Sequence, residues 1–129
     1  MKADELKFRD LEVAARARIS HFRDSNGRLC HSRPDGSDWS PAQWLQAVIG
    51  ELGEYANERK KFERGDLTFE EYKRKAEAEL ADVAIYLSTL AQRALDMPGS
   101  PHPNGVDLPA AIISKFNAVS ERVGSDIRL

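Results

Sequence analysis

The sequence predicts an all-α protein with a four-helix-bundle-like architecture, formed by a single domain over residues 1–129. Two observations lead to this prediction. Apolar residues recur at helical spacing in four segments, and no segment alternates apolar and polar residues as a strand does. The chain length suits one domain, and four amphipathic helices can bury their apolar faces against one another.

The first predicted helix covers residues 3–22. This segment contains neither glycine nor proline, and its apolar residues form a loosely amphipathic pattern. Residues 24–39 are predicted to form a loop, because they contain the turn-forming pairs Asn26-Gly27 and Asp35-Gly36.

The second predicted helix begins at the start signal Ser40-Pro41-Ala42-Gln43. Ser40 is the expected N-cap, Pro41 suits the first helical position, and Gln43 can cap the backbone of Ser40 in return. We expect this helix to run to about Arg64, where Gly65 ends it.

The third predicted helix opens at the capping box Thr68-Phe69-Glu70-Glu71 and extends to about Leu95. A stiff loop follows, marked by Pro98, Pro101, Pro103 and Gly105. The last helix is expected to begin at Asp107-Leu108-Pro109 and to end near Gly124.

The composition argues against several classes of protein. The 19 basic and 21 acidic residues give a net charge of −2, without the basic excess of a nucleic-acid-binding protein or the polybasic tail of a membrane-surface protein. The single cysteine, Cys30, excludes an internal disulfide and a cysteine-based zinc cluster. No apolar segment has the length of a membrane span, and the first residues lack the apolar core of a signal peptide. We therefore expect a cytoplasmic protein that binds neither nucleic acid nor membranes.

Two acidic motifs, Glu51-Leu-Gly-Glu54 and Glu79-Leu-Ala-Asp82, fall on the two helices that flank the predicted turn. At 100° per residue, the two carboxylates of each motif lie about 60° apart, on one side of their helix. Both motifs have the same rotational sense relative to the apolar arc, and their distances from the turn match. Folding of the hairpin is predicted to pair Glu54 with Glu79 and Glu51 with Asp82, so that all four carboxylates converge.

A divalent cation is the expected partner of these four carboxylates. Like charges at this spacing cost a helix roughly 0.2–0.5 kcal/mol per pair unless a cation lies between them. Oxygen ligands suit Mg²⁺ or Mn²⁺, and the Glu-x-x-His motifs of di-iron bundles are missing because neither acidic helix contains histidine. The alternative interpretation is a surface of solvated charges.

The region from Trp39 to Leu90, with its two acidic motifs on two capped helices, resembles the MazG-like all-α nucleotide pyrophosphohydrolases. Lys115-Phe116-Asn117-x-x-Ser120-x-Arg122-x-Gly124 is similar to the closing segment of phage-type members. The resemblance implies hydrolysis of a nucleoside triphosphate to the monophosphate and pyrophosphate. Members of the MazZ type act on (d)GTP, which makes a purine nucleotide such as dGTP or GTP the first substrate to consider.

The resemblance also implies roles for individual residues. Mg²⁺, for which Mn²⁺ would substitute, is expected to be held by Glu51, Glu54, Glu79 and Asp82. Glu51 and Glu54 are the predicted catalytic residues, and Glu54 or Glu58 is the candidate general base for the attacking water.

Four further residues are predicted to bind substrate. Lys115 and Arg122, seven residues apart on one helix face, are candidates for the β- and γ-phosphates, although cations at a helix end often only complement its dipole. Asn117 is a candidate for sugar or phosphate, and Trp39 for stacking on the base.

The wide apolar arcs of the helices and the resemblance both imply a homodimer or a homotetramer built as a dimer of dimers. Two other functions fit the same sequence. One is a phosphoribosyl-ATP pyrophosphohydrolase, which has a similar fold; the other is a non-enzymatic helical interaction module whose acidic face binds a basic partner.

Overall fold

The computed structural model describes residues 1–99 and 104–129, and within these ranges the chain is helical and contains no strand. Pro101 and Pro103 of the predicted stiff loop lie outside the described residues. The helices are α1 (Phe8–Arg18), α2 (Pro41–Glu63), α3 (Phe69–Ala91) and α4 (Leu108–Arg122), with short 3₁₀ turns η1 (Ala3–Glu5) and η2 (Ile19–His21). The predicted all-α class and the four helices are confirmed.

The first predicted helix is interrupted near its start. Lys7 has an extended backbone, with φ −106° and ψ 148°, and its N–H donates to the Asp10 carboxylate at 3.3 Å. This local cap starts α1 at Phe8 instead of allowing one helix from residue 3.

The α2–α3 hairpin begins each of its helices where the capping boxes predict. The Gln43 side chain accepts from the Ser40 N–H at 2.9 Å, and the Glu71 side chain accepts from the Thr68 N–H at 2.8 Å. Gly65, with φ +83°, forms the left-handed turn between the helices. Each reciprocal cap satisfies backbone donors that a helix start would otherwise leave unpaired.

α3 ends at Ala91, earlier than the predicted Leu95, because a later segment takes its place. The Ala91 carbonyl accepts from the Val106 N–H, and the Asn104 carbonyl accepts from the Leu95 N–H, both at 2.9 Å. The chain after the proline-rich loop therefore docks on the end of α3, where a continued helix would have blocked it.

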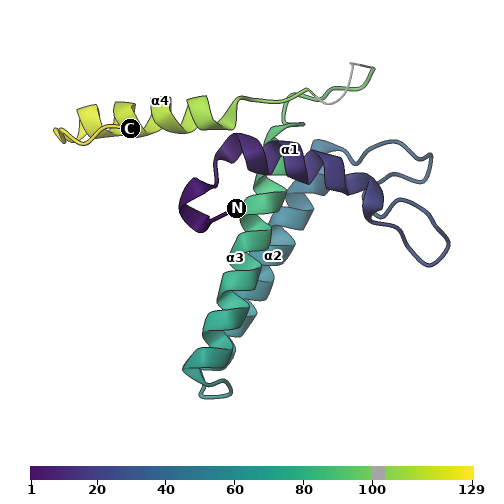
Figure 1. Ribbon diagram of the computed structural model, residues 1–129, viewed down its shortest axis with the longest axis horizontal. Helices are drawn as coiled ribbons and strands as arrows, with labels where there is room; N and C mark the ends of the chain where they lie inside the picture. Colours follow the sequence, from purple (N-terminus) through teal and green to yellow (C-terminus); the bar gives the residue numbers. More distant parts are fainter. Residues whose placement is uncertain (100–103) are drawn as a thin grey trace.

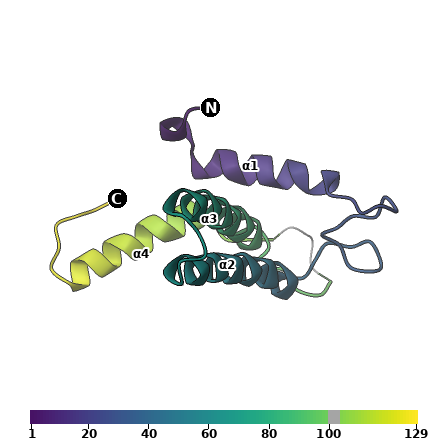
Figure 2. The same ribbon diagram turned by 90° about the horizontal axis from the view of Figure 1, so that it is seen from below.

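α3 lies between α1 and α2, whereas α4 extends away from this group (Figures 1 and 2). The packing predicted for four helices is thus present within one chain for three of them. No helix in the described ranges is both long enough and apolar enough to cross a membrane.

Polar contacts tie the region between α1 and α2 to the end of α3. The side chain of Arg93 is 93% buried; it pairs with Asp38, donates to the Thr89 carbonyl at 3.2 Å and lies over the Trp44 ring at 4.8 Å. Arg16 of α1 donates to the Gln92 side chain at 2.8 Å. The purely apolar core of the described chain is small: its buried hydrophobic residues are Ala15, Trp44, Val48 and Ala91.

Candidate metal centre

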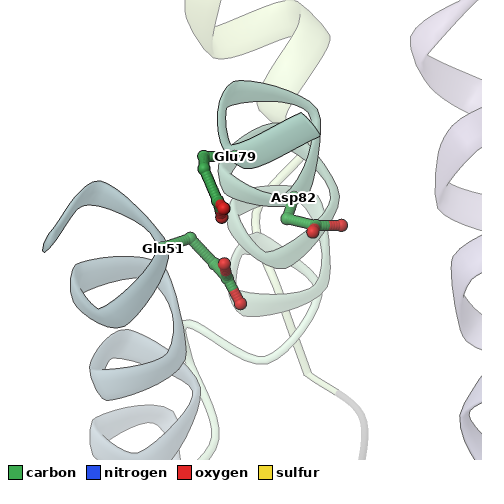
Figure 3. Close-up of side chains that lie close together, drawn as sticks. All are labelled: Glu51, Glu79 and Asp82. Carbon is green, nitrogen blue, oxygen red and sulfur yellow. The ribbon is translucent and has the colours of Figure 1, made fainter. Parts of the chain in front are cut away.

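The hairpin brings together three of the four predicted acidic ligands. Glu51 comes from α2, and Glu79 and Asp82 come from successive turns of α3 (Figure 3). One carboxylate oxygen of each lies within 4.8 Å of the other two, a separation that a single cation can bridge. Glu51 and Glu79 are half-buried and Asp82 is exposed. We call these three residues the acidic cluster.

Glu54 is not part of the acidic cluster. Its side chain is exposed on α2, because it lies about 60° further round the helix than Glu51 and so turns away from α3. Glu51, rather than Glu54, lies beside Glu79, which differs from the predicted pairing. The role of Glu54 as a ligand or as a catalytic residue stays a prediction.

Glu58 is placed away from the acidic cluster and is already paired. Its side chain is 93% buried, and its carboxylate lies 3.0 Å from the Lys61 ammonium and 3.6 Å from that of Lys75. The hydrogen bond from Lys61 lowers the pKa of Glu58. A carboxylate that two lysines hold in an ion pair, with a lowered pKa, accepts a proton weakly. Glu58 therefore does not suit the role of general base.

The pKa of Glu51 is raised. Burial is the main cause, followed by the hydrogen bond with Glu79 and by the negative charges of Asp82, Glu79 and Glu54. Glu51 therefore holds its proton more strongly than an isolated carboxyl does, and a cation would relieve the same repulsion. The donors are all carboxylate oxygens, which fit Mg²⁺ or Mn²⁺ in chemistry.

A cavity of about 310 Å³ adjoins the acidic cluster, between α1, α2 and α3. Glu51 and Asp82 form part of its wall, and Arg18 of α1 contributes a positive charge to it. Much of the remaining wall is aromatic, formed by Phe22, His31, Trp44 and Tyr86. A cavity of this size, lined by aromatic rings and a few charged groups, is compatible with a small-molecule site.

The aromatic part of the cavity wall is held by close ring contacts. His31 stacks on Trp44, with ring centroids 5.2 Å apart and planes within 12°, and its Nε2 lies 3.2 Å from the Tyr86 hydroxyl. Burial lowers the pKa of His31 despite the opposing charge of Asp38, so the ring is neutral at pH 7. The pKa of Tyr86 is raised, by burial and then by the charges of Glu51 and Asp82, so its hydroxyl keeps its proton.

Trp39, the predicted stacking residue, lies behind this wall. Its ring packs edge-on against His31 and Trp44, with centroids 4.9 Å and 5.1 Å away. Trp44, on α2, is the tryptophan that forms part of the cavity wall.

The predicted phosphate-binding residues all lie on α4, which extends away from α1, α2 and α3 (Figure 1). Asn117 is engaged elsewhere: its side chain accepts from the Leu129 N–H at 3.0 Å and donates to the Leu129 carbonyl at 3.2 Å. Lys115 borders an apolar groove on α4, and Arg122 is exposed at the end of this helix. One chain alone does not bring these three residues to the cluster, and their roles toward a substrate stay predictions.

Arg18 and Phe22 are cavity residues that the sequence interpretation missed. They are four residues apart, and the Arg18 guanidinium lies 5.4 Å from the centre of the Phe22 ring. Residues four apart share a face of the helix predicted over residues 3–22, so the sequence could indicate that Arg18 and Phe22 are neighbours. The sequence could not indicate that this face turns toward the acidic motifs.

Comparisons of the chain with protein-family models, with curated proteins and with solved structures found no match.

Proposed function

We propose that this protein is a Mg²⁺-dependent nucleoside triphosphate pyrophosphohydrolase that converts a (d)NTP and water to the (d)NMP and pyrophosphate. One observation carries the proposal: the acidic cluster opens onto a cavity whose wall combines aromatic rings with a cation. A nucleotide has both parts that such a site would accept, a planar base and an anionic phosphate chain. The paired acidic motifs, which resemble those of the MazG-like enzymes, support the reaction type.

In this proposal, Glu51, Glu79 and Asp82 hold the metal ion, with Glu54 as the predicted fourth ligand. Bound Mg²⁺ supplies charge neutralisation for the phosphates and lowers the pKa of a coordinated water. The chain's own residues do the rest. The rings of His31, Trp44 and Tyr86 provide the wall for the base, and Glu54, outside the tight cluster, is the candidate acceptor of the water's proton.

We further propose that the active form is a homodimer or a homotetramer. The buried apolar core of the described chain is too small to stabilise a domain of this length comfortably. α4 presents an apolar groove instead of packing on its own hairpin. In an oligomer, α4 of a second copy is the element that would bring Lys115, Asn117 and Arg122 to the site.

The test is product analysis after incubation with each of the eight NTPs and dNTPs plus Mg²⁺, starting from dGTP and GTP. We expect monophosphate and pyrophosphate from a subset, and a loss of at least about 100-fold in Glu79→Gln, since even outer-shell changes at metal sites cost 10–100-fold. Glu77→Gln is the matched control on α3, because Glu77 is exposed, pairs with Lys73 at 3.1 Å and is not part of the acidic cluster.

Three outcomes contradict the proposal. Stepwise release of orthophosphate would assign a different cleavage. Turnover of phosphoribosyl-ATP alone, included as a ninth substrate, would assign the related enzyme. No turnover, together with no heat on titration of Mg²⁺ or Mn²⁺, would favour a protein-interaction module with an acidic face.

A further inference from the structure

Arg18 forms no ion pair and no hydrogen bond with any residue in the part of the chain that the structure describes. It is the last residue of α1, its side chain is exposed, and Glu51 and Asp82 border the same cavity. Arg16, two residues earlier, differs in that it donates to Gln92. The Arg18 guanidinium lies over the Phe22 ring, 5.4 Å from its centre.

The charge of the site requires such a cation if the site binds phosphates. The three carboxylates of the acidic cluster exceed the charge of one divalent ion, so the metal-bound cluster alone remains negative. A polyphosphate chain would be repelled by it over the part that the metal does not touch. A guanidinium is suited to this part, because its fixed N–H fork matches two phosphate oxygens.

Burial separates the two ends of the cavity. Trp44 is 1% exposed and His31 is 8% exposed, whereas Arg18 belongs to the exposed surface. A hydrated, charged chain is easier to accommodate at the open end than at the buried aromatic end, because burial of a charge is costly. The arrangement thus directs the phosphates toward Arg18.

We propose that Arg18 binds the β- and γ-phosphates of the substrate, the part that leaves as pyrophosphate. This inference rests on the proposed function, since it takes the substrate to be a nucleoside triphosphate. Within one chain, this proposal places anion binding on α1; the residues of α4 would contribute only from a second copy.

The test is calorimetric binding of inorganic tripolyphosphate and of dGMP to the Mg²⁺-saturated protein. Tripolyphosphate presents the phosphate chain without the base, and dGMP presents the base without the terminal phosphates. We expect Arg18→Ala to weaken tripolyphosphate binding by about 10–100-fold, the size of a charge-assisted hydrogen bond, and to change dGMP binding by less than about threefold. Arg18→Lys should retain part of the affinity, because it keeps the charge and loses the fork.

Arg74→Ala is the matched control, because Arg74 is an exposed arginine of α3 that does not border the cavity. It should bind tripolyphosphate as the unchanged protein does, and Mn²⁺ titration should give equal or tighter metal binding in Arg18→Ala. The inference fails if the unchanged protein does not bind tripolyphosphate, if Arg18→Ala binds it equally well, if dGMP binding falls in parallel, or if Arg74→Ala loses as much.

Kinetics separate this inference from the proposed reaction. If the protein hydrolyses nucleotides and Arg18→Ala leaves KM and kcat unchanged, the role of Arg18 falls and the reaction stands. If tripolyphosphate binding depends on Arg18 but no nucleotide is hydrolysed, the reaction falls and the anion site stands. When both hold, we expect KM to rise by about tenfold or more in Arg18→Ala.

Discussion

The carboxylate form of Glu51 is the form that would bind a metal ion, but it destabilises the metal-free fold. In the metal-free protein its pKa is raised, chiefly by burial and then by Glu79 and the other nearby acids. A carboxyl whose pKa is higher in the folded state favours folding at low pH, and this contribution is lost as pH rises through the folded pKa. At neutral pH the ionised form of Glu51 therefore destabilises the metal-free fold.

We accordingly expect Glu51→Gln to stabilise the metal-free protein at pH 7 by about 0.5 kcal/mol, the size of a like-charge pair on a helix. The difference should disappear as pH falls through the raised pKa of Glu51 toward the range of ordinary carboxyls. Thermal unfolding across pH, with and without Mn²⁺, measures it. Mn²⁺ should stabilise the unchanged protein and have little effect on the variant. Equal stabilisation of both proteins by Mn²⁺ would remove Glu51 from the site.

Arg93 stabilises the region that forms the aromatic wall of the cavity. It is buried, pairs with Asp38 across 55 residues of sequence, and covers Trp44. Replacement of Arg93 by Ala leaves Asp38 without its partner and exposes Trp44, so we expect a loss of about 2–4 kcal/mol in the free energy of unfolding. Urea denaturation measures it.

Arg33→Ala is a suitable comparison for Arg93→Ala, because Arg33 is exposed and donates to the backbone carbonyl of the same Asp38 at 2.7 Å. We expect this change to cost less than about 1 kcal/mol, as for a surface hydrogen bond. A similar cost in both variants would show that the buried pair does not hold this segment.

At the scale of the elements, the contact of Gly105 with the end of α3 leaves no room for a side chain. A Cβ on Gly105 would lie 2.3 Å from the Gln92 carbonyl carbon and 2.4 Å from the Ala91 oxygen. Both atoms belong to the backbone and cannot move aside. We expect Gly105→Ala to cost about 1–3 kcal/mol in unfolding free energy or to detach the segment that carries Val106, measurable by denaturation and amide hydrogen exchange.

Gly50→Ala is the opposite case and serves as the control. Gly50 lies inside α2, and a Cβ there would meet nothing within 4 Å. Alanine should therefore stabilise the helix by about 0.5–1 kcal/mol through its higher helix propensity. If Gly105→Ala proved as harmless as Gly50→Ala, the docking of this segment on α3 would be contradicted.

The helix starts and the helix ends differ in how far the sequence predicts them. Both hairpin helices begin at their predicted capping boxes, because a cap is decided by residues within one turn. The end of α3 depends on Asn104 and Val106, which are distant in the chain, and local signals could not reveal it. The acidic cluster shows the same division. Helix phase predicted that four carboxylates converge, and three of them, Glu51, Glu79 and Asp82, lie together. The contribution of α1 to the cavity depends on tertiary packing.

At the scale of the whole molecule, α4 carries an apolar surface that its own chain leaves uncovered. An apolar groove runs along this helix and its following segment, lined by Ile112, Phe116, Val119, Val123 and Ile127 among others. α2 also exposes a stripe of apolar residues at helical spacing, Leu45, Ile49 and Leu52, of which Ile49 is 57% exposed. Exposed apolar surface of this extent on a chain with a small core favours self-association.

We expect the protein to be a dimer or tetramer by light scattering, and we expect Phe116→Asp to dissociate it. Phe116 is 40% exposed in one chain and borders the groove, so a carboxylate there would have to be buried without a partner in any interface that covers α4. Ser114→Asp adds the same charge to the same helix about 200° away from Phe116, and it should leave the assembly intact. Because the small core of one chain makes folding depend on association, the melting temperature should rise with protein concentration for the unchanged protein and for Ser114→Asp, and it should fall in Phe116→Asp. Two results would show that α4 is not the interface: a wild-type protein that is monomeric at every concentration, or a Phe116→Asp variant that assembles normally. Either result would also mean that α4 does not bring Lys115, Asn117 and Arg122 to the site of a neighbouring copy.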